Sequence, residues 1–276
     1  MRLSLPPREG EALADDAATA ETPVNPYIPP QAFLRDRHDA TSYRRSTLVL
    51  VGLLYLSLGV AATGIISPWW LFLAVPLIYL RLALALHELL HVCPAEEVSW
   101  FHRLTMVFES PFCLGYREHR AIHFAHHRFA STDKDPELYQ IVGGPWRALA
   151  NAMISPERGF AGWVRRHGFS RSLAIESGVR CAAFITLATL APVAFLAYWI
   201  ALRLSVGLAS YIFHYALHNS DGVLGTFPLP VSNSIVRAAG LLFGREPVLI
   251  LTEHERHHLW PRVRARDLLQ LPEPRG

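Results

Sequence analysis

The sequence predicts an all-α integral membrane protein, with four transmembrane helices in two hairpins and a cytosolic helical cap that carries clustered histidines. Three observations predict this fold: two long runs almost free of charged side chains, a hydrophobic content of 51%, and fourteen histidines in a chain of 276 residues. The formal net charge is only +3, from 26 basic and 23 acidic side chains, so the overall charge does not indicate a nucleic-acid partner.

The N-terminal part of the chain differs in composition from the rest. It is rich in alanine, proline and acidic side chains, and it has no apolar run of the length that a secretory signal requires. We expect residues 1–40 to form a disordered cytosolic tail and residues 41–276 to form one membrane domain. The three cysteines, Cys93, Cys113 and Cys181, have no disulfide or metal-binding spacing and are expected to be reduced.

The first hairpin is predicted by a run without charged side chains from residue 46 to residue 80. A Ser-Pro-Trp-Trp sequence at 67–70 divides the run near its middle, and paired tryptophans suit a turn at the membrane interface. Each half reaches the roughly 20 residues that a helix needs to cross the hydrocarbon layer. We expect spans at about 47–66 and 69–91, the second continuing past Arg81.

The second hairpin is predicted by the run from residue 181 to residue 220, in which Arg203 is the only charged side chain. This run supports two further spans, at about 176–195 and 198–219. The turn between them could lie near Pro192 or near Arg203, and the sequence leaves both positions open.

Two hairpins place both termini and the segment between the hairpins on the same side of the membrane. Those parts contain most of the arginines, among them Arg44, Arg45, Arg165 and Arg166. Because basic residues are enriched in cytoplasmic loops, both termini and the histidine clusters are expected to be cytoplasmic.

Eleven of the fourteen histidines fall into four clusters at the cytoplasmic ends of the predicted helices and beyond them, and His119 is the first histidine of the second cluster. Histidines four residues apart lie on one face of a helix, so both imidazoles can reach a single metal ion. Two of the clusters also share the pattern His-x-x-His-His. The candidate metal ligands are His87 and His91, then His123, His126 and His127, then His214 and His218, and finally His254, His257 and His258.

Imidazole ligands suit zinc, copper, iron or nickel, so the donor type alone does not identify the metal. The number of donors is more informative. A structural zinc ion takes four ligands and a catalytic one takes three, whereas this set could supply two metal ions with four or five ligands each. The sequence therefore predicts a dinuclear centre beside the membrane, and such a centre indicates oxygen chemistry.

These clusters resemble the three histidine boxes of the membrane fatty acid desaturase and hydroxylase superfamily, and the likeness extends from Thr47 onward. The histidines within 87–91, 123–127 and 254–258 match the first, second and third box. The resemblance implies two non-haem iron ions as cofactor and no catalytic side chain beyond the metal centre.

The resemblance also implies that His218 is a ninth ligand. His214 stands where some relatives have an asparagine that acts through water, so we expect it to contact a metal directly or through water. His119 is expected to contact a ligand residue without binding metal itself, or to lie at the surface. Asp133 and Asp135 could hydrogen-bond a ligand histidine. Glu88 could orient a ligand imidazole or face the solvent.

The resemblance favours an enzyme, an O2-dependent fatty acyl (lipid) desaturase that uses external electrons to introduce a C=C bond. One alternative is a hydroxylase or ketolase of fatty acyl, alkane or carotenoid substrates. An alternative of another class is a membrane metal-binding or transport protein. The expected partners are a lipid or other hydrophobic substrate and O2. A separate electron donor of the ferredoxin, rubredoxin or cytochrome type is also expected, because the chain has no haem-binding His-Pro-Gly-Gly motif and no cysteine set for an iron–sulfur cluster.

Overall fold

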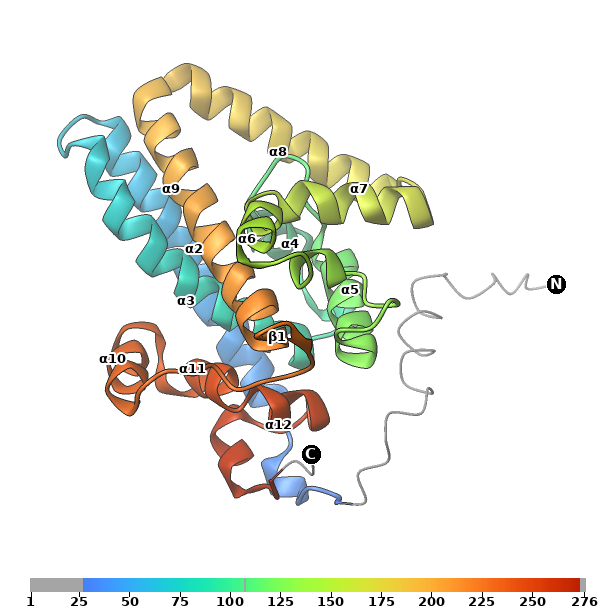
Figure 1. Cartoon of the computed structure of the whole chain (residues 1–276). Coiled ribbons are helices and arrows are strands. Elements are labelled where there is room, and N and C mark those ends of the chain that lie inside the picture. Colours follow the sequence, from blue (N-terminus) through green and yellow to red (C-terminus); the bar gives the residue numbers. More distant parts are fainter. Residues whose placement is uncertain (1–26, 107, 274–276) are drawn as a thin grey trace.

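The computed structural model describes residues 27–106 and 108–273. This part of the chain is mostly helical, and four of its helices are long and apolar enough to cross a membrane. The predicted all-α membrane fold is therefore confirmed (Figure 1).

The first hairpin consists of α2 (Arg37–Ala62) and α3 (Leu71–Val92), joined through the 3-10 turn η2 (Pro68–Trp70). The start of α2 is fixed by Asp36, whose carboxylate accepts hydrogen bonds from two backbone N–H groups of the first turn, at 2.8 and 3.1 Å. As a result, the helix that contains the first expected span begins well before residue 47. The second span, Pro68–Val92, lies close to its expected position.

The second hairpin consists of α8 (Arg171–Leu190) and α9 (Pro192–Ser210), and α9 continues into the π-helical turn η5 (Tyr211–Ala216). Of the two turn positions left open, the structure has the one at Pro192. Proline disfavours a helical conformation in the preceding residue, and that residue leaves the helical region with φ −142° and ψ 63°. The expected spans at 176–195 and 198–219 therefore placed the turn between them too late in the sequence.

The charge within α9 is paired instead of marking a turn. Arg203 forms an ion pair with Glu157 of α7 (Ser155–His167), and one of its nitrogens donates to the second carboxylate oxygen at 3.0 Å. An ionisable side chain close to lipid is costly unless it has a partner, and this pair provides one.

The membrane helices form a bundle in which α3 packs against both α2 and α9, and these three helices run side by side (Figure 1). Apolar side chains from all three helices fill its interior, for example Leu54, Val75 and Leu202. Other apolar side chains point outward, such as Leu73 and Leu190, which are 70% and 78% exposed. These outward side chains fit helices whose surroundings are lipid.

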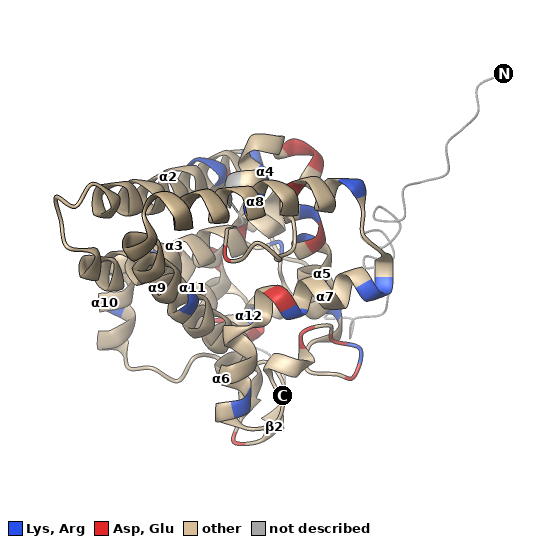
Figure 2. Cartoon of the chain, turned by 90° about the horizontal axis from the view of Figure 1, so that it is seen from above, with Lys and Arg blue, Asp and Glu red and all other residues tan. Residues whose placement is uncertain are grey.

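The remaining elements lie beside the bundle or at one of its ends. Figure 2 shows charged residues gathered near α4, α5 and α7, whereas the hairpin-turn ends of the spans carry none. Besides α7, the elements outside the two hairpins are η1 (Gln31–Phe33), η3 (Ala95–Glu97), α4 (Trp100–Met106), α5 (Tyr116–Phe129), η4 (Leu138–Gln140), α6 (Pro145–Met153), β1 (Asn219–Ser220), β2 (Val223–Leu224), α10 (Asn233–Phe243), α11 (Arg245–Thr252), α12 (His254–Leu259) and η6 (Ala265–Gln270).

The segment before α2 is ordered from residue 27 onward, so the expected disorder of residues 1–40 is wrong for 27–40. Leu34 pairs with Val263 in a β-bridge, and the ring of Tyr27 meets that of Trp260 edge-on at 6.0 Å. The N-terminal segment is thereby attached to the segment that follows α12. Residues 1–26 of the expected tail lie outside the described residues.

Candidate metal centre

The histidines of the first and second boxes lie on two neighbouring helices. His87 and His91 are at the C-terminal end of α3, with ring centroids 5.0 Å apart. His123, His126 and His127 lie on α5. The rings of His91 and His127 approach to 4.7 Å between centroids, so the ends of these two helices bring the first two boxes together.

The third box and His218 complete the arrangement from the C-terminal half of the chain. α12 carries His254, His257 and His258, and His218 follows the π-helical turn η5 with one residue, Leu217, between them. π-helical turns are rare and often occur at functional sites. All nine predicted box histidines, with His218 counted among them, therefore meet at one end of the bundle.

The nine histidines divide into two clusters. In the first cluster, one ring nitrogen from each of four histidines lies within 4.8 Å of the others, and in the second the same holds for three. Nε2 of His123 adds to the first at 2.8 Å from His91, and Nε2 of His254 adds to the second at 3.0 Å from His218. The first cluster is His87, His91, His123, His127 and His257, and the second cluster is His126, His218, His254 and His258.

The two clusters touch each other and have the properties of cation sites. The rings of His127 and His258 stack with centroids 4.1 Å apart, one from each cluster. Both ring nitrogens of His127, His257 and His258 are buried without a hydrogen-bond partner among the described residues. An unpaired buried nitrogen costs about 1–3 kcal/mol. Metal ions bound between the rings would give one nitrogen of each ring a partner, so the residues present fit a dinuclear metal centre.

The electrostatic surroundings keep these histidines in the form that binds metal. Burial lowers the pKa of His123, His127, His254, His257 and His258 well below the ordinary value, and the neighbouring imidazoles lower it further. Burial likewise lowers the pKa of His218 to about 2. Each ring is therefore neutral at physiological pH, with a nitrogen lone pair available to a metal.

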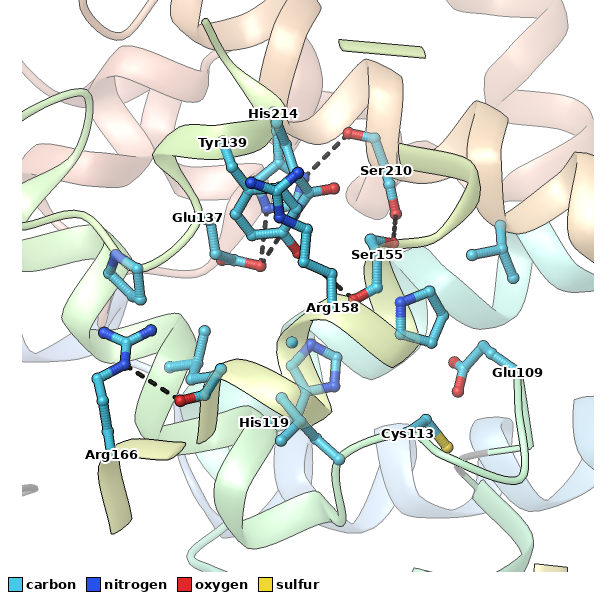
Figure 3. A pocket seen from close by; sticks show the side chains of 18 of the residues that line it. Glu109, Cys113, His119, Glu137, Tyr139, Ser155, Arg158, Arg166, Ser210 and His214 are labelled. Atoms are coloured by element: carbon cyan, nitrogen blue, oxygen red, sulfur yellow. Dashed lines mark hydrogen bonds and ion pairs between the residues drawn. The ribbon is translucent and has the colours of Figure 1, made fainter. Parts of the chain in front are cut away.

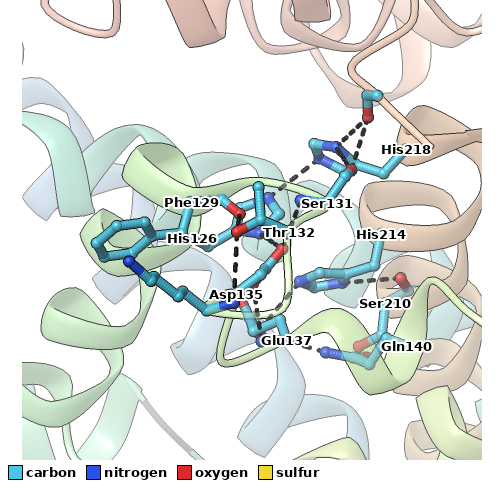
Figure 4. Close-up of polar contacts among 12 residues, drawn as sticks. His126, Phe129, Ser131, Thr132, Asp135, Glu137, Gln140, Ser210, His214 and His218 are labelled. Carbon is cyan, nitrogen blue, oxygen red and sulfur yellow. Dashed lines mark hydrogen bonds and ion pairs between the residues drawn. The ribbon is translucent and has the colours of Figure 1, made fainter. Parts of the chain in front are cut away.

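Hydrogen bonds fix the orientation of two rings in the second cluster (Figure 4). Nδ1 of His126 lies 3.0 Å from a carboxylate oxygen of Asp135, and Nδ1 of His218 lies 2.8 Å from the backbone oxygen of Gly225. In both rings these acceptors leave Nε2 as the nitrogen that faces the cluster. Such outer hydrogen bonds are typical of histidines that hold metals.

Asp135→Asn is expected to weaken metal binding by roughly 10- to 100-fold, the usual effect of losing an outer carboxylate that supports a ligand histidine. The carboxylate of Asp135 accepts from both His126 and the backbone N–H of Ser131, and a neutral amide cannot replace it in full. Anaerobic titration with ferrous iron measures the change. Asp133→Asn is the matched control, because Asp133 is exposed and should leave the affinity unchanged. Equal effects of the two variants would contradict the role of Asp135 as the carboxylate that supports the ligand His126.

The structure places His214 beside the second cluster but not in it. Its ring lies 5.5 Å from that of His126, yet Nδ1 lies 3.0 Å from the backbone oxygen of Ser210 and Nε2 lies 3.1 Å from the carboxylate of Glu137 (Figure 4). Both nitrogens thus face acceptors. The expected contact of His214 with a metal, directly or through water, stays a prediction, and in this geometry His214 is part of a cavity wall.

Glu137 was not singled out in the sequence, although it follows closely after the second box. Burial alone would raise its pKa, but the charge of His214 and the hydrogen bond between the two residues outweigh burial and lower the pKa to about 2. Glu137 is therefore a carboxylate at physiological pH, held against His214.

A second buried charge pair braces the first box. Glu88 has no exposed surface, and both of its carboxylate oxygens accept from one guanidinium nitrogen of Arg35 at 2.7 Å. Another nitrogen of Arg35 donates to the backbone oxygen of Pro261 at 2.8 Å. One oxygen of Glu88 also lies 3.5 Å from Nδ1 of His87. Because Glu88 is buried, it does not face the solvent, which was one of its two expected positions. Through Arg35, it connects α3 to the segment after the third box.

Two cavities that share part of their walls lie beside the clusters, and the inner one borders the histidines directly. The inner cavity, of about 110 Å³, is bounded by histidines of both clusters and by apolar side chains such as Leu86, Leu90 and Phe213. The outer cavity, of about 270 Å³, shares Glu137 and His214 with the inner one. The two cavities therefore adjoin, and the outer one is bordered by residues of α7.

Comparison with known proteins identifies one match. A family model described as fatty acid desaturase matches residues 65–272, a range that contains every predicted box histidine. Searches of the curated proteins and of the solved structures find no match.

Proposed function

The chain belongs to the fatty acid desaturase family, and on this premise we propose that it is a membrane di-iron oxidase that introduces a C=C bond into a fatty acyl lipid. The observation that carries the proposal is the pair of touching histidine clusters, each with enough ring nitrogens for one metal ion. The first cluster would hold one iron with up to five histidines, and the second would hold the other with four.

When bound, the iron pair supplies the O2 activation and hydrogen abstraction that an unactivated C–H bond requires. The protein contributes position and surroundings. Leu86, Leu90 and Phe213 line the inner cavity, and the ring of Phe213 stacks on His87 with centroids 5.2 Å apart. These apolar side chains would hold an acyl chain beside the clusters and keep water away from the reacting carbon.

The position of the clusters favours an oxidase over a metal transporter. Transport requires ligands near the middle of the membrane, along a polar path. In this chain His87 and His91 lie at the end of the second span, and the other clustered histidines follow or precede the spans in the sequence. Such an arrangement fits a reaction centre at the membrane surface.

The same arrangement supports a cytoplasmic centre that receives its electrons from outside. The segment before α2 pairs with the segment after α12, so both flank the same end of the bundle. We propose that this end faces the cytoplasm, because its flanking segments are rich in arginine. A separate donor of the ferredoxin, rubredoxin or cytochrome type would dock there.

Mass spectrometry of lipids from a host of defined lipid composition tests the proposal. Cells that express the chain should accumulate acyl groups with one additional double bond, whereas cells that express His258→Ala should not. This variant removes a candidate metal-ligating imidazole at the contact between the two clusters. Acyl groups, alkanes or carotenoids that gain oxygen instead would show a hydroxylase or ketolase. A purified protein that binds zinc and no iron would contradict the oxidase altogether.

A further inference from the structure

The outer cavity is lined by three arginines from one face of α7. Arg158, Arg165 and Arg166 recur at helical spacing on α7, and Gly159 and Gly162 between them have no side chains that would fill the cavity. Figure 3 labels Arg158 and Arg166 in the wall of this cavity. None of the three arginines forms an ion pair with a residue that the structure describes. An arginine cluster without carboxylate partners, facing a cavity, is suited to an anion.

The contacts that these arginines do make leave donors free. The guanidinium carbon of Arg158 lies 4.2 Å from the ring centroid of Tyr139, and one terminal nitrogen donates to Asn151 at 2.6 Å. Arg165 and Arg166 use only Nε, each for a backbone oxygen of their own helix at 3.3 Å. Their terminal nitrogens make no hydrogen bond within the described part of the chain.

Charged side chains are distributed unevenly between the walls of the two cavities. The two carboxylates in the wall, Glu109 and Glu137, border both cavities, whereas the arginines border only the outer one. Glu137 is paired with His214 at 3.1 Å, and Glu109 accepts a hydrogen bond from Tyr79 at 3.2 Å. The outer cavity is thus positive, and the inner one is apolar apart from its histidines and these paired groups.

We propose that the outer cavity binds the anionic group, a phosphate or a carboxylate, of an amphiphilic substrate whose apolar chain enters the inner cavity. The inference rests on the proposed oxidase function and narrows it. It selects acyl substrates with a charged head group over alkanes and carotenoids, which carry no anion for the arginines to bind.

Calorimetric titration of the whole chain in neutral detergent tests the inference with four probes: dodecyl phosphate, dodecanoate, dodecanol and inorganic phosphate. At least one of the two charged amphiphiles should bind about tenfold or more tightly than dodecanol, and the tighter of the two identifies the head group. The Arg158→Ala/Arg165→Ala/Arg166→Ala variant should lose this preference. Arg171→Ala, an exposed arginine outside the cavity, should keep it.

Three results would overturn the inference: equal affinity for dodecanol and both charged probes, inorganic phosphate binding as tightly as dodecyl phosphate, or an unchanged preference in the triple variant. Arg166→Ala alone repeats the test if the triple variant does not fold, because Arg166 lies at an exposed helical position. Iron content is measured in the same samples. The binding assay involves no oxidation, so a chain that binds the anion but neither holds iron nor oxidises lipid would refute the proposed function and not the head-group site.

Discussion

Removing one histidine from a single cluster should remove one iron and leave the other. His91→Ala takes a nitrogen from the first cluster, and His218→Ala takes from the second a nitrogen that lies 3.0 Å from both His126 and His254. Each variant is expected to fall from about two iron ions per chain to about one, because the two clusters use separate nitrogens. The double variant should hold none. Elemental analysis after anaerobic loading and desalting measures the content.

The activity of both single variants should fall by at least about 100-fold, since losing an outer partner of a ligand already costs roughly 10- to 100-fold. His167→Ala is the control, because His167 is exposed on α7 and its ring packs on Trp163 at 4.2 Å, outside both clusters. It should keep both irons and full activity. Loss of both irons in either single variant would contradict two separate sites, and unchanged iron would contradict the ligand assignment.

The spacing of the histidines predicted the nine that gather, and His214 as well, because residues three and four apart share a helical face. It did not assign them to two sites. Adjacent histidines in fact belong to different clusters: His126 and His258 to the second, His127 and His257 to the first. Consecutive helical residues point about 100° apart, so a His-His pair directs one ring to each metal site. The adjacent histidines of the repeated His-x-x-His-His pattern therefore explain why each of these two boxes contributes to both clusters.

Other features could not be read from spacing, because they depend on contacts between distant parts of the chain. Arg35 lies within the segment expected to be disordered, and its partner Glu88 is 53 residues away. His214 has the spacing of a ligand, but Glu137 and the backbone of Ser210 occupy both of its nitrogens. The turn at Pro192 follows from the effect of a proline on the residue before it, and the length of the uncharged run alone did not indicate this position.

The buried Arg35–Glu88 pair predicts the largest effect on stability outside the clusters. Arg35→Met leaves the carboxylate of Glu88 buried without its partner, and breaking such a pair typically costs about 3–5 kcal/mol of unfolding free energy. The variant should show this loss in denaturant unfolding of the metal-free protein in detergent. Arg35→Met/Glu88→Met, in which both charges are absent, should regain most of it.

Arg264→Met provides a matched control for Arg35→Met. Arg264 also joins the N-terminal segment to the C-terminal one, through Asp36 and Asp39 at 2.6 and 2.8 Å, but the Asp36 side chain is 54% exposed. Ion pairs in contact with water contribute about 0–1 kcal/mol each, so Arg264→Met, which removes two of them, should lose no more than about 2 kcal/mol. If the two single variants lost the same free energy, the connection between the segments would depend on packing and not on the buried charge pair. A larger loss for Arg35→Met would show that Glu88, and with it the end of α3 that carries the first box, is held in place by the segment before α2.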